Sequence, residues 1–205
     1  MLIAELDAGP NAVIATFSPD DRYVITAADL PADSYSVFDT SDGAFVARFG
    51  GDANQFAGLW AKFTPSGEQL AVSSAGGNVF IYDFAAILSG ASSEDSIVRT
   101  IPAHDSFVFE PAISPDGMLL ATSSATEPTR LWDMATGTLL GEFGTIATRG
   151  VAFHPTLPWL YVAAGFHIRA HTFDVDELMA IARASLTREL TEEECEQYLH
   201  QPCET

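Results

Sequence analysis

Residues 113–133 read ISPDGMLLATSSATEPTRLWD, a Pro-Asp-Gly turn followed by a β-rich run that closes on a tryptophan and an aspartate. Proline presets φ at the first central turn position and glycine accepts the left-handed conformation, so the turn predicts a hairpin between apolar strands. Around it we expect strands over 106–113, 118–123, 129–133 and 138–143. Four antiparallel strands in about 40 residues form a layer too thin to bury both of its faces alone.

The same two markers occur four times along the chain. Prolines at positions 19, 65, 115 and 155 are 46, 50 and 40 residues apart, and the aspartates of the aromatic-Asp pairs are 44, 50 and 41 apart. The pairs are Phe38-Asp39, Tyr82-Asp83, Trp132-Asp133 and Phe173-Asp174. Markers that advance together at this period indicate stacked repeats. The sequence therefore predicts an all-β protein, a β-propeller of four four-stranded blades with a short α-helical C-terminal tail.

These turns and aromatic-Asp pairs resemble those of the WD-repeat family over roughly residues 1–175, most closely in the third repeat. The fourth repeat leaves the β pattern after Asp174 and lacks a fourth strand. The resemblance implies closure by a strand from the N-terminus, with Met1–Leu6 completing the last blade. We expect blades at about 7–50, 51–101, 102–144 and 145–175 plus 1–6, followed by a helical tail over 176–205.

The family also has a hydrogen-bonded tetrad, in which a histidine is linked through Ser/Thr and a turn aspartate to the tryptophan. Only Ala103-His104 resembles its histidine-containing pair, and Ala75-Gly76-Gly77 and Ala125-Thr126-Glu127-Pro128 stand where the turn aspartate is expected. We therefore expect the complete tetrad to be absent and the blades to depend on apolar packing. The polar insertion Leu88–Ser96 is expected to be a mobile loop.

Four blades are the low limit for a closed propeller ring. Three alternatives remain open: a closed four-blade ring, a homodimer in which two chains form a larger ring, and a fragment of a longer propeller. The second and third are favoured over the first.

The C-terminal tail has a helical period from Asp176, with Asp174 or Asp176 as N-cap. Thr191-Glu192-Glu193-Glu194 is a capping box that opens a second helix. The segment 190–203 is similar to the helical endings of bacterial WD-repeat proteins, many of which carry a STAND-type nucleotide-binding signalling domain. That similarity implies a bacterial signalling protein. The sequence has no Gly-rich phosphate-binding loop ending in Lys-Ser/Thr, so NTPase activity is not implied.

Composition describes a globular chain of 205 residues, 47% hydrophobic and 18% charged, with a net charge of −19 and Lys62 as its single lysine. Clustered basic residues are what nucleic-acid binding requires, so nucleic acid is excluded as a partner. Acidity favours a basic protein or peptide partner, with solubility as the alternative reason for it. Apolar runs are too short for a membrane span and a secretory signal is absent, so we expect a cytoplasmic protein without membrane contact.

Aromatic residues near the inter-blade loops are the best binding candidates. They are Phe56, Trp60, Phe107 and Phe109, together with Glu110. If exposed, such aromatics would anchor a protein partner. Alternate residues of a first strand are more often buried, which is the competing interpretation.

Other candidate sites are weaker. Cys195 and Cys203 could form a disulfide, although reduced thiols are expected in a cytosolic chain. With His200 they offer only three ligands at a spacing unlike zinc sites, so no metal and no cofactor are expected. The remaining histidines, His104, His154, His167 and His171, accompany no nucleophile motif.

The sequence thus predicts a noncatalytic WD-repeat interaction scaffold, the sensor part of a bacterial signalling protein. The alternatives are a hydrolase-like propeller enzyme with a site in the central channel and a truncated fragment without independent function.

Overall fold

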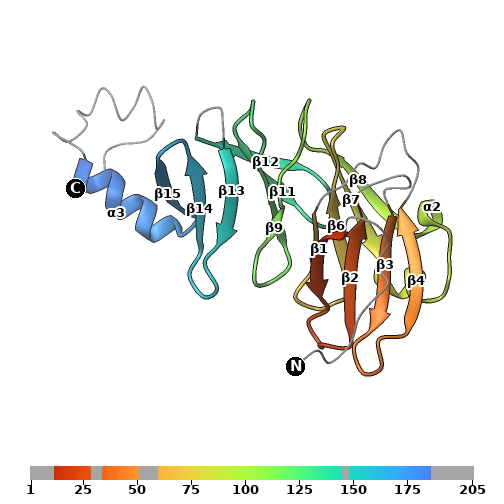
Figure 1. The fold of residues 1–205 in the computed structure, drawn as a ribbon. Coiled ribbons are helices and arrows are strands. Elements are labelled where there is room, and N and C mark those ends of the chain that lie inside the picture. Colours follow the sequence, from red (N-terminus) through yellow and green to blue (C-terminus); the bar gives the residue numbers. More distant parts are fainter. Residues whose placement is uncertain (1–11, 29–33, 51–59, 145–147, 186–205) are drawn as a thin grey trace. The chain divides into compact units, whose positions relative to one another are not determined.

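The computed structural model describes residues 12–28, 34–50, 60–144 and 148–185, and every structural statement below concerns these residues. The chain divides into two compact units, Met1–His171 and Thr172–Thr205, which are described separately. Figure 1 shows the first unit as successive small sheets, each built from consecutive strands.

Three sheets have four strands each, in sequence order, and their paired strands are antiparallel. The first blade contains β1 (Ala12–Phe17), β2 (Tyr23–Ala28), β3 (Ser34–Asp39) and β4 (Phe45–Gly50). The second contains β5 (Ala61–Phe63), β6 (Gln69–Ser73), β7 (Asn78–Asp83) and β8 (Ile97–Pro102). The third contains β9 (Ala112–Ile113), β10 (Leu119–Thr122), β11 (Thr129–Asp133) and β12 (Leu139–Phe143).

A fourth sheet has three described strands, β13 (Thr148–Phe153), β14 (Trp159–Ala164) and β15 (His167–Thr172). This architecture confirms the predicted all-β propeller fold. The strand expected to complete the last blade, Met1–Leu6, lies outside the described residues.

Each predicted proline turn is present and has the same internal hydrogen bonds. The amides of Ser18, Thr64 and Ser114 each donate to the carbonyl five residues later at 2.9 Å. Gly117 closes its turn with φ of +74°, a conformation in which a side chain would be strained. In the third turn the Ser114 hydroxyl also donates to Asp116 at 2.5 Å. That hydrogen bond holds the pKa of the Asp116 carboxyl below its ordinary value.

The structure differs from the expected pattern in two segments. The first strand of the third repeat was predicted over 106–113, but β9 is only Ala112–Ile113, with one isolated bridge between Val108 and Ser124. Pro111 explains the break because it has no amide hydrogen for the ladder. The insertion Leu88–Ser96 was expected to be a mobile loop. Instead α1 (Phe84–Leu88) and α2 (Ser93–Ser96) occupy this part of the chain, because Asp83 and Ser92 cap their N-termini.

The core lies between the blades. One cluster joins side chains of the first and second blades, and a second cluster joins those of the second and third. Along β7, Phe80 and Tyr82 belong to the first cluster, whereas Val79 and Ile81 belong to the second. Successive strand residues point to opposite faces, so one strand of the second blade supplies both cores.

In the second unit, α3 (Val175–Ser185) begins with Asp174, whose carboxylate accepts the Glu177 amide at 3.0 Å. This bond confirms Asp174 as one of the two predicted N-caps. The Glu177 carboxylate in turn accepts the Thr172 hydroxyl at 2.6 Å. No helix among the described residues is long and apolar enough to cross a membrane.

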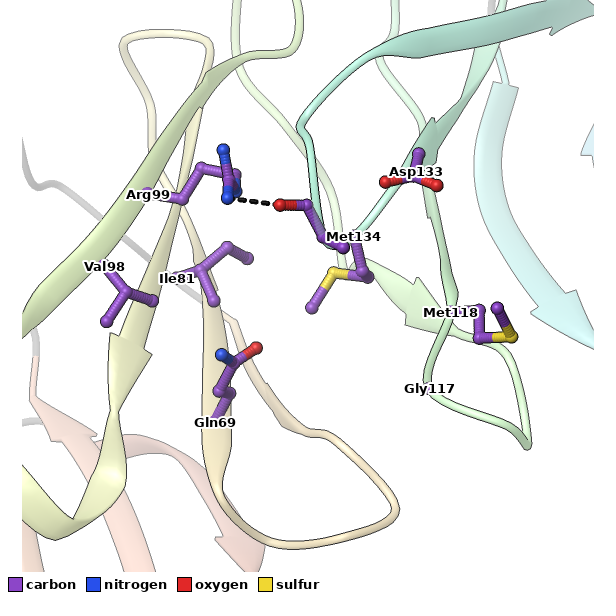
Figure 2. A pocket seen from close by; sticks show the side chains of 9 residues that line it. Gln69, Ile81, Val98, Arg99, Gly117, Met118, Asp133 and Met134 are labelled. Carbon is purple, nitrogen blue, oxygen red and sulfur yellow. Dashed lines mark hydrogen bonds between the residues drawn. The ribbon is translucent and has the colours of Figure 1, made fainter.

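A cavity of about 290 Å³ lies between the second and third blades (Figure 2). Its second-blade wall comes from β6, β7 and β8, and its third-blade wall comes from the β9–β10 turn and the end of β11.

Candidate functional site

Three of the predicted binding residues pack against one another. The ring centroids of Trp60 and Phe107 are 5.5 Å apart, those of Trp60 and Phe109 are 5.9 Å apart, and those of Phe107 and Phe109 are 5.4 Å apart. All three pairs are edge-to-face, the geometry that the ring quadrupoles favour. We call Trp60, Phe107 and Phe109 the aromatic cluster. Its three side chains are half-buried.

Backbone pairing around Val108 orients the two phenylalanines of the cluster. Val108 is buried in the core between the second and third blades, and its amide donates to the Ser74 carbonyl at 3.2 Å. Phe109 donates its amide to the Ser123 carbonyl at 3.0 Å. Because neighbouring residues of an extended segment point to opposite sides, burial of Val108 leaves Phe107 and Phe109 on the other side, where they meet Trp60.

An ion pair lies on the same two segments. Lys62 Nζ is 3.5 Å from Glu110 Oε1, and the two side chains are 48% and 56% exposed. Lys62 alternates along β5 with the buried Ala61 and Phe63. An ion pair this exposed contributes at most about 1 kcal/mol to folding, so both charges remain accessible to a partner.

The sequence predictions for this site have different outcomes. Trp60, Phe107 and Phe109 come together, and none of them is fully buried, contrary to the competing interpretation of buried strand positions. Glu110 is exposed and paired with Lys62. Phe56 lies outside the described residues, as do the candidate disulfide partners Cys195 and Cys203.

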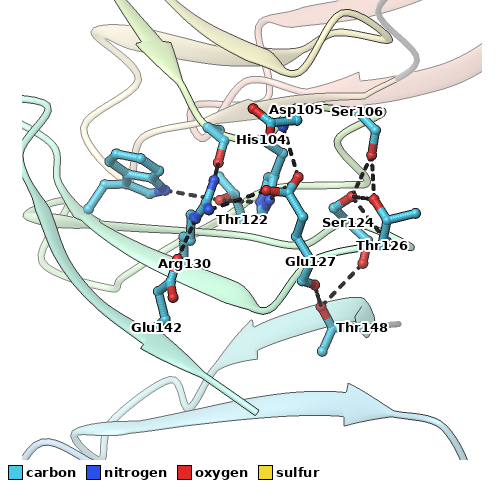
Figure 3. A network of polar contacts seen from close by, with 12 residues as sticks. His104, Asp105, Ser106, Thr122, Ser124, Thr126, Glu127, Arg130, Glu142 and Thr148 are labelled. Atoms are coloured by element: carbon cyan, nitrogen blue, oxygen red, sulfur yellow. Dashed lines mark hydrogen bonds and ion pairs between the residues drawn. The ribbon is translucent and has the colours of Figure 1, made fainter. Parts of the chain in front are cut away.

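A network of polar side chains extends through the third blade (Figure 3). Trp132 Nε1 donates to Thr122 Oγ1 at 3.0 Å, and Thr122 Oγ1 is 3.0 Å from His104 Nε2. On the other side of the imidazole, His104 Nδ1 is 3.3 Å from Glu127 Oε2. We call His104, Thr122, Glu127 and Trp132 the tetrad.

The expectation that the complete tetrad is absent is only partly wrong for the third blade. Hydrogen bonds link Trp132, Thr122 and His104, whereas His104 Nδ1 lies 3.3 Å from Glu127 Oε2 without a hydrogen bond. Glu127 takes the position of the missing turn aspartate, and its longer side chain still reaches the histidine. The sequence signal was available, because Glu127 lies in the β10–β11 turn of the repeat that carries both His104 and Trp132. A search restricted to aspartate misses a carboxylate with one more methylene.

The Glu127 carboxylate has further partners. Its Oε2 accepts the Asp105 amide at 2.8 Å, and its Oε1 is 3.2 Å from Arg130 Nη2. Arg130 also donates from Nε to Glu142 at 2.7 Å and from Nη1 to the Ala103 carbonyl at 2.7 Å. These contacts join the segment before β9 to β11 and β12, so the network stabilises the blade rather than presenting free groups to a ligand.

The direction of hydrogen bonding assigns the histidine proton. The indole N–H can only donate, so Thr122 Oγ1 accepts from Trp132 and its own hydrogen is free to be donated to His104 Nε2. The imidazole proton then lies on Nδ1, which is 3.3 Å from Glu127 Oε2 but makes no hydrogen bond among the described residues. This arrangement uses a neutral imidazole, and burial lowers the pKa of His104, with Arg130 acting in the same direction and Glu127 opposing it.

The lowered His104 pKa predicts a pH dependence of stability. Because the pKa of His104 is lower in the folded than in the unfolded chain, the unfolded chain binds the proton first as pH falls. The contribution of His104 to the free energy of unfolding is therefore fully present above the pKa of the unfolded chain, about 6.5, and is lost as pH falls below it. We expect the free energy of unfolding, measured by urea denaturation, to decrease between about pH 7 and pH 5. His171, whose pKa burial also lowers, contributes in the same direction.

Two variants separate these contributions. In His104→Gln the pH dependence is expected to be flatter than in the wild type, and His171→Gln is the matched control that removes only the contribution of His171. Parallel curves for the wild type and His104→Gln between pH 5 and pH 8 would contradict this account of the tetrad.

The first and second blades lack the tetrad at the corresponding register positions. Thr122 in β10 has the same register position as Val72 in β6 and Thr26 in β2. Each lies three residues after the residue that pairs with the aspartate of the aromatic-Asp pair. The aromatic residue that corresponds to Trp132 is Tyr82 in the second blade and Phe38 in the first. Thr26 Oγ1 is buried without a hydrogen-bond partner among the described residues.

The remaining histidines do not converge on a site. His154 Nδ1 accepts the Leu157 amide at 2.9 Å within its own turn, and the His171 ring lies 5.0 Å from that of Phe143. His167 is exposed. Within the described part of the chain, no three or more His, Cys, Asp or Glu side chains are grouped to hold a metal ion.

Comparisons with known proteins agree with the repeat pattern. Residues 88–133 match the family model described as WD domain, G-beta repeat, a range that includes all four tetrad residues. The chain is 36% identical over 73 residues to the Denticleless protein homolog of Danio rerio, covering 35% of this chain and 11% of that protein. It is 29% identical over 94 residues to WD repeat-containing protein 1 of Mus musculus, covering 45% of this chain and 14% of that protein.

A solved structure shows the same fold over most of the chain. The crystal structure of the computationally designed Ika4 protein aligns with a TM-score of 0.66 and 17% sequence identity, covering 85% of this chain and 99% of that chain. The chain thus spans only a small part of the curated relatives, whereas it is similar in fold to nearly all of the designed protein. Residues 88–133 are thus similar to a WD repeat, and the solved structure shows similarity of fold alone.

Proposed function

We propose that this chain is a noncatalytic WD-repeat protein-interaction scaffold that captures a protein or peptide partner at the aromatic cluster. The observation that carries the proposal is the mutual packing of Trp60, Phe107 and Phe109 while all three remain half-buried. Tryptophan and other aromatic residues are typical binding hot spots, because they bury a large area at a small cost in conformational entropy.

Rigid positioning supports the binding role. Each ring of the aromatic cluster is held by two others, and the backbone beside it is paired to the second or third blade. A partner that covers the cluster therefore loses little free energy to ordering these side chains. The protein-binding character of WD-repeat chains agrees with this use of the site.

The partner carries basic side chains in this proposal. The net charge of −19 attracts cationic segments over long range, and the exposed Glu110 carboxylate lies beside the cluster segments. A lysine or arginine over an exposed aromatic face gains a cation–π interaction as well. Binding is then expected to weaken as salt is added.

One arrangement among the described residues resembles catalytic machinery, but it does not favour an enzymatic role. Thr122, His104 and Glu127 form a hydroxyl–imidazole–carboxylate chain. Thr122 is 0% exposed, however, and its oxygen already accepts the Trp132 indole hydrogen. A nucleophile must meet its substrate in a cleft, so this buried chain fits a structural role.

The binding site is tested by truncating one ring of the cluster. Selection of random twelve-residue peptides displayed on phage against the wild-type chain is expected to enrich sequences with basic and aromatic residues. In Phe107→Ala, affinity for the selected peptides should fall by about 30-fold, as expected for a hot-spot residue worth about 2 kcal/mol. Circular dichroism should show the same fold in both proteins.

A matched control is Phe45→Ala, which truncates an exposed phenylalanine of β4 outside the cluster. Its affinity for the same peptides should equal that of the wild type. If Phe107→Ala and Phe45→Ala weaken peptide binding equally, or if neither weakens it, the aromatic cluster is rejected as the binding site. Glu110→Gln should reduce both affinity and its salt dependence if the partner is basic.

The remaining features of the proposal follow from the sequence. The role is that of the sensor part of a bacterial signalling protein in the cytoplasm, with the propeller over 1–175 and the helical tail over 176–205. Pairing of two chains into a larger ring is part of the proposal, and the molecular mass in solution tests it independently of peptide binding.

A further inference from the structure

The cavity between the second and third blades is a second site, separate from the aromatic cluster. Phe109 precedes β9 and Gly117 follows it, so the two sites are at opposite ends of this strand. The cavity is lined by Gln69, Ile81, Val98, Arg99, Gly117, Met118, Asp133, Met134 and Ala135. None of these residues belongs to the aromatic cluster or the tetrad.

Hydrogen bonds between the blades fix the two walls of the cavity. Arg99 of β8 donates from Nη1 to the Thr136 carbonyl at 2.9 Å and from Nη2 to the Ala135 carbonyl. On the third-blade side, the Met134 amide donates to the Met118 carbonyl at 2.9 Å. The guanidinium is therefore committed to the backbone, and the cavity is preformed rather than opened by a ligand.

The apolar lining continues from the floor of the cavity to its rim. Ile81 and Met134 are buried at the floor, whereas Val98 is 50% exposed and Met118 is 64% exposed. Two large apolar side chains exposed on opposite walls of one hollow are a feature of surfaces that bind a partner. Methionine adapts its shape to different apolar side chains, as at other protein-binding surfaces.

Two polar groups in the lining are available to a ligand. The Gln69 side-chain amide makes no hydrogen bond to another described residue, and it offers both a donor and an acceptor. Asp133 Oδ1 accepts the Thr136 amide and hydroxyl at 2.7 and 2.8 Å, which leaves Oδ2 without a hydrogen bond among the described residues. The same two hydrogen bonds lower the pKa of Asp133, so its carboxylate is ionised at neutral pH.

Size and charge together select the class of ligand. A volume of about 290 Å³ is at the lower limit of the roughly 300–1,000 Å³ typical of small-molecule sites, so an apolar side chain fits better than a whole cofactor. The lining holds one carboxylate, Asp133, and one guanidinium, Arg99, which is already hydrogen-bonded to the Thr136 and Ala135 carbonyls. The net charge of −19 disfavours anions. A free amide such as that of Gln69 pairs well with a peptide bond.

We propose that this cavity binds an extended peptide segment of a partner protein, with an aliphatic side chain placed over Ile81 and Met134, between the wall that carries Val98 and the wall that carries Met118, and an adjacent basic residue at Asp133. Gln69 hydrogen-bonds the peptide backbone next to the inserted side chain. The aliphatic anchor distinguishes this ligand from the aromatic and basic segment proposed for the aromatic cluster.

Substitution of Val98 tests the cavity. Val98→Arg places a longer, cationic side chain at the second-blade wall of the cavity and repels a basic ligand, and the matched control is Val46→Arg. Val46 has the corresponding place in the outermost strand of the first blade and is also exposed. Random twelve-residue phage peptides selected on the wild type should include a class with Leu, Ile or Met next to Arg or Lys. This class should bind Val98→Arg at least about tenfold more weakly and Val46→Arg with unchanged affinity.

Methionine methyl NMR locates the bound peptide. The chain has four methionines, Met1, Met118, Met134 and Met179, so two of the four methyl signals report on the cavity. A synthetic peptide of the Val98-sensitive class should shift the Met118 and Met134 signals and leave that of Met179 unchanged. Absence of any Val98-sensitive peptide, or shifts that spare Met118 and Met134, would overturn the proposal.

The two binding proposals fail separately in this design. Loss of the aliphatic class alone in Val98→Arg, with retention in Phe107→Ala, supports the cavity whatever the outcome at the aromatic cluster. Loss of every selected peptide in Phe107→Ala, with none lost in Val98→Arg, supports the cluster and rejects the cavity.

Discussion

Gly77→Ala is expected to lower the free energy of unfolding by about 4 kcal/mol or more, a size that single substitutions rarely reach. Gly77 has φ of +88°, where a residue with a side chain pays roughly 1–2 kcal/mol in strain. A Cβ atom at this position would also lie 1.9 Å from the His104 carbonyl oxygen. This overlap is costly because the Cβ atom is fixed to the Gly77 backbone and the atom that it meets belongs to the His104 backbone, so no flexible side chain can move away.

The effect should extend to the third blade. The Gly77 carbonyl accepts the His104 amide at 2.9 Å, so separating the two backbones breaks this hydrogen bond and moves the first residue of the tetrad. Urea denaturation measures the loss of stability. The indole N–H signal of Trp132 in an NMR spectrum reports the change in the tetrad.

Gly90→Ala is the matched control. Gly90 has a similar φ of +80°, but a Cβ atom there meets nothing within 4 Å. Its cost should be limited to the strain of roughly 1–2 kcal/mol. Equal destabilisation by the two substitutions would show that the close contact with His104 contributes nothing.

Thr122→Val is expected to cost about 2–5 kcal/mol although it hardly changes the shape of the side chain. Thr122 Oγ1 accepts the Trp132 indole hydrogen and is the partner of His104 Nε2, and both groups lie in the interior. Each buried polar group left without a partner costs roughly 1–3 kcal/mol. Urea denaturation at pH 7 measures the sum, and the Trp132 indole N–H signal should shift.

The register of the sheets supplies the control for this substitution. Thr26 has the corresponding position in the first blade and is also buried, but its Oγ1 has no hydrogen-bond partner among the described residues. Thr26→Val should therefore leave stability unchanged or raise it by up to about 1 kcal/mol, because it removes an unsatisfied buried hydroxyl. Equal losses for the two variants would contradict the role given to the tetrad.

The architecture was predictable because its markers are local. Pro-Asp-Gly turns and aromatic-Asp pairs specify hairpins through the φ preferences of proline and glycine, and their spacing implies stacked blades. The short β9 was not predicted, since the effect of Pro111 on the ladder competes with the apolar pattern of residues 106–113. The helices around Leu88–Ser96 were missed because their caps, Asp83 and Ser92, lie before weak helical sequences.

The candidate site was predictable only in part. Loop position indicated Trp60, Phe107 and Phe109, but their contact with one another depends on the long-range pairing of Val108 with the second and third blades. The cavity could not be anticipated, because its walls come from residues as distant in sequence as Gln69 and Ala135. The periodicity of a sequence predicts on which face of a strand a residue lies, but it does not predict which residue of the neighbouring blade it contacts.

The double use of β7 has a consequence for how the repeats evolve. Because Val79 and Ile81 serve one core and Phe80 and Tyr82 the other, inserting or deleting a single residue in this strand would exchange the two sets of side chains. Both cores would then receive side chains of the wrong size at once. Length changes are consequently tolerated in the connections between strands, which agrees with the unequal repeat lengths of 46, 50 and 40 residues.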